Sequence, residues 1–139
     1  MEKYNKEIFR ISKDKARAKD LFEMAKERLD IIIKSIPESV PYKILEEYYE
    51  ISVQLITSFM YSEGYKTLSH VALIHFLSKE CDFNRDEIQI LDNMRKFRHG
   101  TIYYGRKESG NFYINHKKEI REIIKKLIHL VKEKLGKEK

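Results

Sequence analysis

Apolar residues recur along nearly the whole chain at intervals of three to four positions, the period of an amphipathic helix rather than of a strand. This pattern predicts five helices joined by short connections, which is the sequence signature of an all-α, up-and-down bundle. The length of 139 residues suits one domain spanning residues 1–139. The expected helices run from about Ser12 to Ser35, Tyr42 to Glu63, Leu68 to Lys79, Asn84 to Tyr104, and Tyr113 or Asn115 to Leu135.

Residues at the helix ends support these limits. Asn84 followed three positions later by Glu87 is the pattern of a capping box, in which each residue satisfies the other's backbone N–H. Ser12 and Thr67 are the expected caps of the first and third helices. A polar loop from Arg106 to Asn111, which includes Gly110, is expected before the last helix. Three glycines are expected to end helices, namely Gly64, Gly105 and Gly136.

The second predicted helix is apolar around most of its circumference. Ile44, Ile51 and Leu55 are spaced for one face, while Leu45 and Ile56 widen the apolar surface. A helix of this kind has to be covered on several sides, so we expect it at the centre of the bundle.

Several classes of protein are excluded by what the chain lacks. There is no parallel-sheet pattern and no glycine-rich phosphate loop, so a Rossmann or P-loop nucleotide site is excluded, and no metal-ligand spacing or cofactor motif occurs. The single cysteine, Cys81, is expected to be a small buried apolar residue. No apolar run approaches the roughly 18 residues that cross a bilayer, and Met1–Tyr4 do not begin a signal peptide, so we expect a cytoplasmic protein without a membrane partner.

Charge is distributed unevenly along the chain. The net charge of +6 divides into +3 over residues 1–37, −6 over residues 38–94 and +9 over residues 95–139. A basic C-terminal third either complements the acidic middle or attracts nucleic acid. The last helix contributes a run of cations, and a possible phosphate-tracking stripe on it consists of Lys118, Arg121, Lys125 and Lys132.

The fourth predicted helix carries polar and charged residues on its apolar face. Arg95 and Arg98 fall on the face of Leu91, and His99 and Tyr103 lie at its edge. Cations in an apolar face are costly unless an anionic or polar group meets them. One interpretation is an anion site, doubled across the twofold axis of a homodimer. The other is internal ion pairing with acidic residues such as Glu46, Glu47 or Glu50.

Two segments carry a resemblance to a known family. The first is Tyr48–Val53 together with Phe59–His70, and the second is Met94–Gly105, with the sequence MRKFRHGTIYYG. In both, and in its layout of helices, the chain resembles the HEPN family of small helical domains associated with nucleotide and RNA chemistry. The first segment resembles the family's aromatic helix, glycine turn and following histidine. The second resembles its signature, an arginine with a histidine after four to six residues.

The resemblance implies a site on the fourth helix. In family members that cleave RNA without a metal, the arginine would hold the scissile phosphate and the histidine would move a proton. Aligning Arg98 with that arginine places Tyr103 where the histidine stands, and a phenol with a pKa of about 10 is a poor base at neutral pH. We therefore expect a homodimer that binds RNA or a nucleotide without strong catalysis. The residues expected to bind are Arg95, Arg98, His99, Tyr103 and Tyr104.

Two alternatives remain open. One is a metal-independent endoribonuclease toxin of a toxin–antitoxin pair, with Arg98 and His99 as its catalytic residues. The other is a non-catalytic interaction module partnered with a minimal nucleotidyltransferase, since one branch of the family carries a tyrosine that such a partner modifies with AMP. His70 is expected to cap or pack at a helix start, and its alternative role is that of a second proton carrier.

Overall fold

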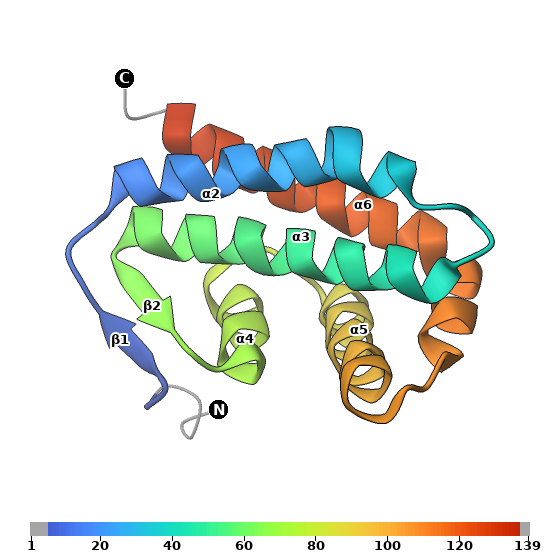
Figure 1. Ribbon diagram of the computed structural model, residues 1–139. Helices are drawn as coiled ribbons and strands as arrows, with labels where there is room; N and C mark the ends of the chain where they lie inside the picture. Colours follow the sequence, from blue (N-terminus) through green and yellow to red (C-terminus); the bar gives the residue numbers. More distant parts are fainter. Residues whose placement is uncertain (1–5, 137–139) are drawn as a thin grey trace.

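The computed structural model describes residues 6–136 and confirms the all-α helical bundle. Helices α2 (Lys15–Glu27), α3 (Pro41–Glu63) and α6 (Glu108–Gly136) lie side by side along the long axis (Figure 1). Helices α4 (His70–Glu80) and α5 (Arg85–Tyr104) cross beneath α3.

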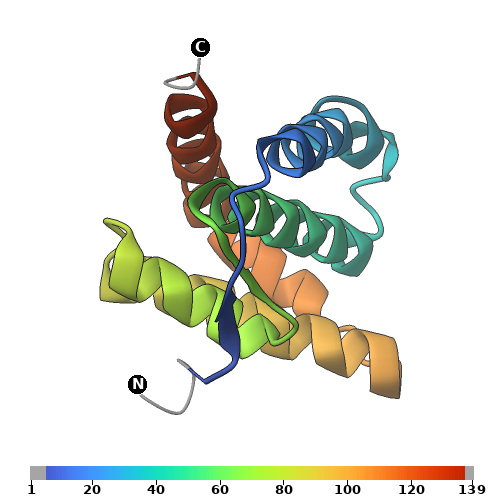
Figure 2. The same ribbon diagram turned by 90° about the vertical axis from the view of Figure 1, so that its left-hand side faces the viewer.

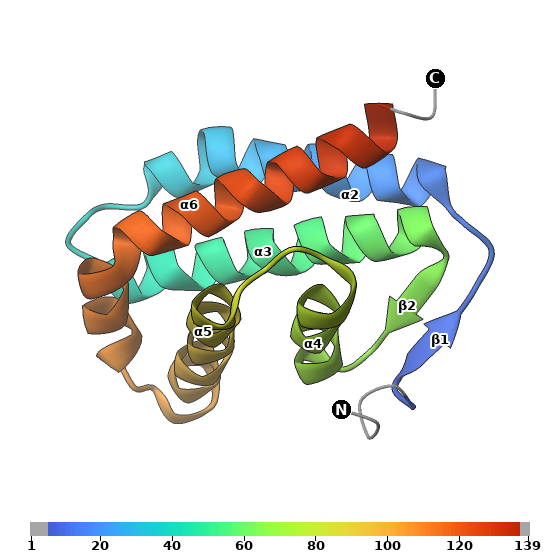
Figure 3. The same cartoon turned by 180° about the vertical axis from the view of Figure 1, so that it is seen from behind.

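Helix α3 forms the core, as its apolar surface predicted. Leu45, Ile51 and Leu55 are completely buried. The helix packs most extensively against α6 and α2, and it also contacts α5 and α4 (Figures 1 and 3). Because α3 is covered from these different sides, its polar residues must find partners on other helices.

The first helix begins later than predicted. Its N-cap is Asp14, whose carboxylate accepts a hydrogen bond from the backbone N–H of Arg17, and Ser12 lies outside the helix. The reason is tertiary: the backbone N–H groups of Ile11 and Asp14 donate to the carbonyls of Gly64 and Tyr61 at the end of α3. This segment therefore lies along α3 before α2 can begin.

The first helix reaches Ser35, as expected, but not as a regular α-helix. After α2 the chain continues through a π-helical turn, η1 (Arg28–Ile32), and a 3₁₀ turn, η2 (Ile33–Ser35). Ile33 is buried there, while Ile31 and Ile32 are exposed. The helical spacing of Ala25, Leu29 and Ile32 in the sequence predicts that Ile32 is buried. This prediction was wrong, because the wider π turn changes which residues face α3.

Two short strands were not expected from the sequence. β1 (Ile8–Arg10) pairs antiparallel with β2 (Tyr65–Thr67), so that Phe9 lies opposite Lys66. Thr67 belongs to β2, and the cap of α4 is instead Ser69, whose hydroxyl accepts from the N–H of Ala72 at 3.1 Å. Strands of three residues are too short for any alternation of apolar and polar positions to be recognised.

Helix α6 begins at Glu108, five residues before the earliest predicted start at Tyr113. Gly110, which favoured a loop in the sequence, lies inside the helix. A Cβ on Gly110 would lie 2.9 Å from Cγ of Pro41, so the glycine permits close packing of α6 on the start of α3. The capping box of Asn84 with Glu87 and the left-handed C-caps at Gly64 and Gly105 are confirmed.

Replacing either C-cap glycine with alanine should destabilise the fold, but to different degrees. Gly105 has a φ of 66° and open space where a methyl group would be added, so Gly105→Ala should cost only the left-handed strain, about 1–2 kcal/mol. Gly64 has a φ of 86°, and a Cβ would lie 2.9 Å from the carbonyl oxygen of Ile11, so Gly64→Ala should cost more. Urea unfolding of both variants measures this, and equal losses would contradict the tight packing at Gly64.

Candidate functional site

Arg98 forms an ion pair inside the protein. Its Nη2 atom lies 2.8 Å from Oε1 of Glu50 on α3, and its guanidinium carbon lies 5.6 Å from the centre of the Tyr49 ring. The contact is an ion pair rather than an aligned hydrogen bond, since Glu50 Oε1 and Arg98 Nε both lack a hydrogen-bond partner among the described residues. Internal pairing with Glu50, one of the two interpretations of the sequence, is therefore present.

Arg95 forms an ion pair with a residue of its own helix. Its Nε donates to Oδ1 of Asp92 at 2.9 Å, and the same carboxylate lies 3.3 Å from the ammonium of Lys96. The Arg95 side chain is 26% exposed, so it is accessible in part. The acidic partner comes from the preceding turn of α5 and not from α3.

His70 joins this cluster from α4. Its Nδ1 lies 2.8 Å from the hydroxyl of Tyr49, which is only 1% exposed. Burial, followed by repulsion from Arg98, lowers the pKa of His70, whereas Glu50 raises it. Burial also raises the pKa of the Tyr49 hydroxyl well above its usual range, so at neutral pH the pair is an uncharged phenol beside a neutral imidazole.

The other predicted residues lie at the exposed end of α5. Tyr103 is 66% exposed and Tyr104 65% exposed. The His99 ring lies 4.6 Å from that of Tyr103 and 6.0 Å from that of Tyr104, while the guanidinium of Arg106 lies 5.0 Å from the Tyr104 ring. Figure 2 shows this end of α5 at the margin of the molecule. The structure thus separates an inner group, Arg95 and Arg98, from an outer group of rings.

The outer group lies in a strongly basic stretch. No acidic residue occurs between Asp92 and Glu108, whereas five cations do. A hollow of about 330 Å³ adjoins it, and its lining includes the cations of Lys96 and Arg106 and one carboxylate, that of Glu108. The five cations are Arg95, Lys96, Arg98, Arg106 and Lys107.

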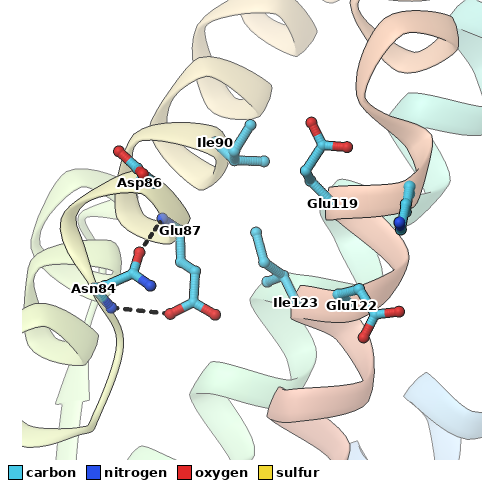
Figure 4. Close-up of a pocket in the computed structure, with 8 residues that line it drawn as sticks. Asn84, Asp86, Glu87, Ile90, Glu119, Glu122 and Ile123 are labelled. Carbon is cyan, nitrogen blue, oxygen red and sulfur yellow. Dashed lines mark hydrogen bonds between the residues drawn. The ribbon is translucent and has the colours of Figure 1, made fainter.

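The opposite end of α5 has the reverse charge. Figure 4 shows a pocket of about 410 Å³ between the start of α5 and α6, into which Ile90 and Ile123 point. Glu87 lines it and accepts hydrogen bonds from the backbone N–H of Asn84 and from Lys126, each at 2.9 Å. The pocket contains none of the residues predicted to bind on α5, but Lys118 of the stripe expected on α6 lines it. The four carboxylates of the pocket outnumber this cation and would repel a phosphate. These are Asp86, Glu87, Glu119 and Glu122.

The remaining expectations concern metals, membranes and the cysteine. Within residues 6–136, no group of three or more metal-ligating side chains comes together, and no helix is long and apolar enough to cross a membrane. Cys81 is partly buried, and burial raises the pKa of its thiol to about 11. A protonated thiol of this kind is unreactive at neutral pH, as expected for an apolar packing residue.

The sequence did not identify every member of the cluster. The helical spacing of Tyr49 in the sequence favours a core residue, and its contact with His70 joins positions 21 residues apart. No local pattern reveals such a pair. The stacking of Arg106 on Tyr104 was also missed, although a cation directly after a helix that ends in two tyrosines is a usable signal.

No known protein family, curated protein or solved structure matches this chain. The candidate site on α5 is therefore defined by its residues and their geometry alone.

The lowered pKa of His70 makes stability depend on pH. Its native pKa lies below 6.5, the value expected when unfolded, so between these two pKa values the unfolded chain binds more protons than the native one. The free energy of unfolding should therefore fall as pH drops through the window below 6.5, and His70→Gln should reduce this dependence. Urea unfolding across pH 5–7.5 is the measurement.

His75 provides the comparison, because burial lowers its pKa as well. The His70→Gln variant should retain the part of the pH dependence of stability that is due to His75. The His70→Gln/His75→Gln variant should show the weakest pH dependence. An unchanged dependence in the single variant would mean that His70 is as readily protonated in the native state as in the unfolded chain.

Proposed function

We propose that this protein is a cytoplasmic, HEPN-like homodimer that binds RNA or a nucleotide through the C-terminal half of α5. The binding residues are Arg95, Arg98, His99, Tyr103 and Tyr104. The observation that carries the proposal is the pair of exposed tyrosines in a stretch with five cations and no acidic residue. Exposed rings beside cations are the usual means of holding single-stranded nucleic acid, since bases stack on the rings while the cations meet the phosphates.

The surface suits a strand better than an enclosed mononucleotide. Tyr103 and Tyr104 are open to solvent, and Arg106 already stacks on one of the rings, so successive bases could extend along this end of α5. Repulsion from the acidic pocket at the start of α5 would confine phosphates to the basic end. We therefore favour single-stranded RNA as the ligand.

The homodimer is part of the same proposal. Ile102 is 44% exposed and lies one helical turn after Arg98, which places an apolar side chain beside the cationic group. Pairing two copies of α5 around a twofold axis would cover this residue and double the basic surface. Sedimentation of the protein with and without Ile102→Asp tests this part separately, and a monomeric wild type would remove it without removing the RNA site.

The tyrosines should account for much of the affinity. Base stacking on an aromatic side chain contributes about 1–3 kcal/mol per base, so Tyr103→Ala/Tyr104→Ala should weaken binding of a labelled single-stranded RNA by at least about tenfold. Tyr103→Phe/Tyr104→Phe keeps the rings and should bind like the wild type. Fluorescence anisotropy at several salt concentrations measures both. Equal loss in the two variants would exclude stacking as the cause.

Substitutions of Glu50 test whether Arg98, a cation of the inner group, contacts the RNA. In the wild type its carboxylate competes with any phosphate for Arg98, so Glu50→Gln should strengthen RNA binding. The Arg98→Ala/Glu50→Gln variant removes both charges without leaving an unpaired carboxylate, and it should bind more weakly than Glu50→Gln. If these two variants bind equally, Arg98 does not contact the ligand.

A second candidate function, metal-independent RNA cleavage, is favoured by the Tyr49–His70 pair. A neutral imidazole close to two arginines has the charge state required of a general base beside a bound phosphate. His70 could thus supply the proton transfer that the signature position, occupied by Tyr103, does not. Incubating labelled RNA with the protein in EDTA decides between the two functions, and cleavage that disappears in His70→Gln but persists in His99→Ala would favour this one.

A further inference from the structure

A second pocket lies away from α5, at the end of the molecule where the chain passes from η2 to α3. It has a volume of about 420 Å³ and is bounded by the connection before α3, by α3 and by α6. Figures 1 and 3 both show the segment between η1 and α3 beside α6 at this end. Ile33 and Ile44 form part of its apolar wall, and Lys34 and Arg121 supply cations. A volume above roughly 300 Å³ is in the range of small-molecule sites.

Arg121 contacts one of two stacked tyrosines at the pocket. Its Nη2 donates to the hydroxyl of Tyr113 at 3.4 Å, and its side chain is exposed. The rings of Tyr113 and Tyr48 stack at 5.8 Å, and both residues are over nine-tenths buried. Because the ring of Tyr113 is buried, its hydroxyl gives the exposed guanidinium an acceptor at a fixed position.

No carboxylate neutralises this guanidinium. Over residues 6–136, neither Arg121 nor Lys34 forms an ion pair, although many other cations of the protein do. Glu38 is the single acidic residue at the pocket, against two cations. An arginine without an ion pair, beside a lysine and two tyrosine hydroxyls, offers donors suited to phosphate, and the two cations outnumber the one carboxylate of Glu38.

The backbone beside the pocket is unusual as well. The chain leaves α-helical geometry in the π turn η1 and the 3₁₀ turn η2 immediately before and at Ile33 and Lys34. Single π turns are rare and occur frequently at functional sites. The irregular backbone before α3 and the arginine without an ion-pair partner are independent observations, and both concern residues of the same pocket.

We infer that this pocket binds a small phosphate monoester with an apolar body, independently of the proposed RNA surface. The phosphate would contact Arg121 and Lys34, while the hydroxyls of Tyr48 and Tyr113 can donate to it, since each hydroxyl both accepts and donates. The apolar body would lie against Ile33 and the neighbouring aliphatic wall. Arg121, one member of the stripe of cations expected on α6, thus lines a pocket, although its side chain is exposed.

Phenyl phosphate is the probe. Inorganic phosphate, which lacks the ring, and benzoate, which carries a carboxylate in place of the phosphate, are the comparison ligands. Wild-type protein should bind phenyl phosphate saturably in ligand-observed NMR, more tightly than inorganic phosphate or benzoate. Arg121→Met should weaken this binding by roughly tenfold or more, the loss expected for a charged hydrogen bond. Tyr48→Phe/Tyr113→Phe keeps both buried rings and should weaken it to a smaller degree.

Lys125→Met is the matched control, because Lys125 is an exposed cation one turn further along α6. It removes the same charge and should leave phenyl phosphate binding unchanged. Circular dichroism checks that each variant is folded. Arg121→Lys should bind with intermediate affinity, since the charge is kept but the planar guanidinium is lost.

Three results would overturn the inference. These are an absence of saturable binding by the wild type, equal weakening by Lys125→Met and Arg121→Met, and binding of benzoate as tight as that of phenyl phosphate. The RNA experiment is unaffected by any of them, because Arg121 lies outside the basic stretch of α5.

Discussion

Four consecutive residues of helix α3 each contact a different element of the bundle through a polar or aromatic side chain. Glu47 pairs with Arg28 of η1 at 2.8 Å, and Tyr48 stacks on Tyr113 of α6. The next two follow the same rule. Tyr49 contacts His70 of α4, and Glu50 pairs with Arg98 of α5. Because successive residues of a helix point about 100° apart, four polar residues in a row necessarily face around the whole helix.

This polar band explains where the sites are. A buried polar group is costly unless it is paired, so each neighbouring element has to bring a partner to the same level of α3. The partners on α4 and α5 create the Tyr49, His70, Glu50 and Arg98 cluster. The partners on α6 create the arginine pocket beside Tyr48. The inner cluster and the arginine pocket therefore share one constraint, the placement of two tyrosines and two glutamates in a row within the central helix α3.

Local signals in the sequence were sufficient for most helix ends but not for the contacts between helices. The Asn84 and Glu87 capping box involves residues three positions apart, so both partners are visible in one turn. Gly110 misled the prediction, because a glycine signals a loop locally but here permits Pro41 to approach, and that neighbour lies far away in the sequence. The same limit applies to the site. Glu50 could be proposed as an arginine partner from charge alone, whereas the pairing of His70 with Tyr49 depends on how α4 crosses α3.

The Arg98–Glu50 pair also bears on whether an internally paired arginine could still hold a phosphate. The two side chains are 25% and 31% exposed, so solvent screens their attraction in part, although Oε1 of Glu50 and Nε of Arg98 are themselves buried. Both of these buried atoms lack a hydrogen-bond partner among the described residues, so the guanidinium keeps a donor that a phosphate could use. A phosphate that reaches the guanidinium would therefore compete with Glu50 for it, and neighbouring cations would add to its attraction. In the absence of ligand, Arg98 then pairs with Glu50, and this contact with α3 keeps the arginine at the surface of the cluster.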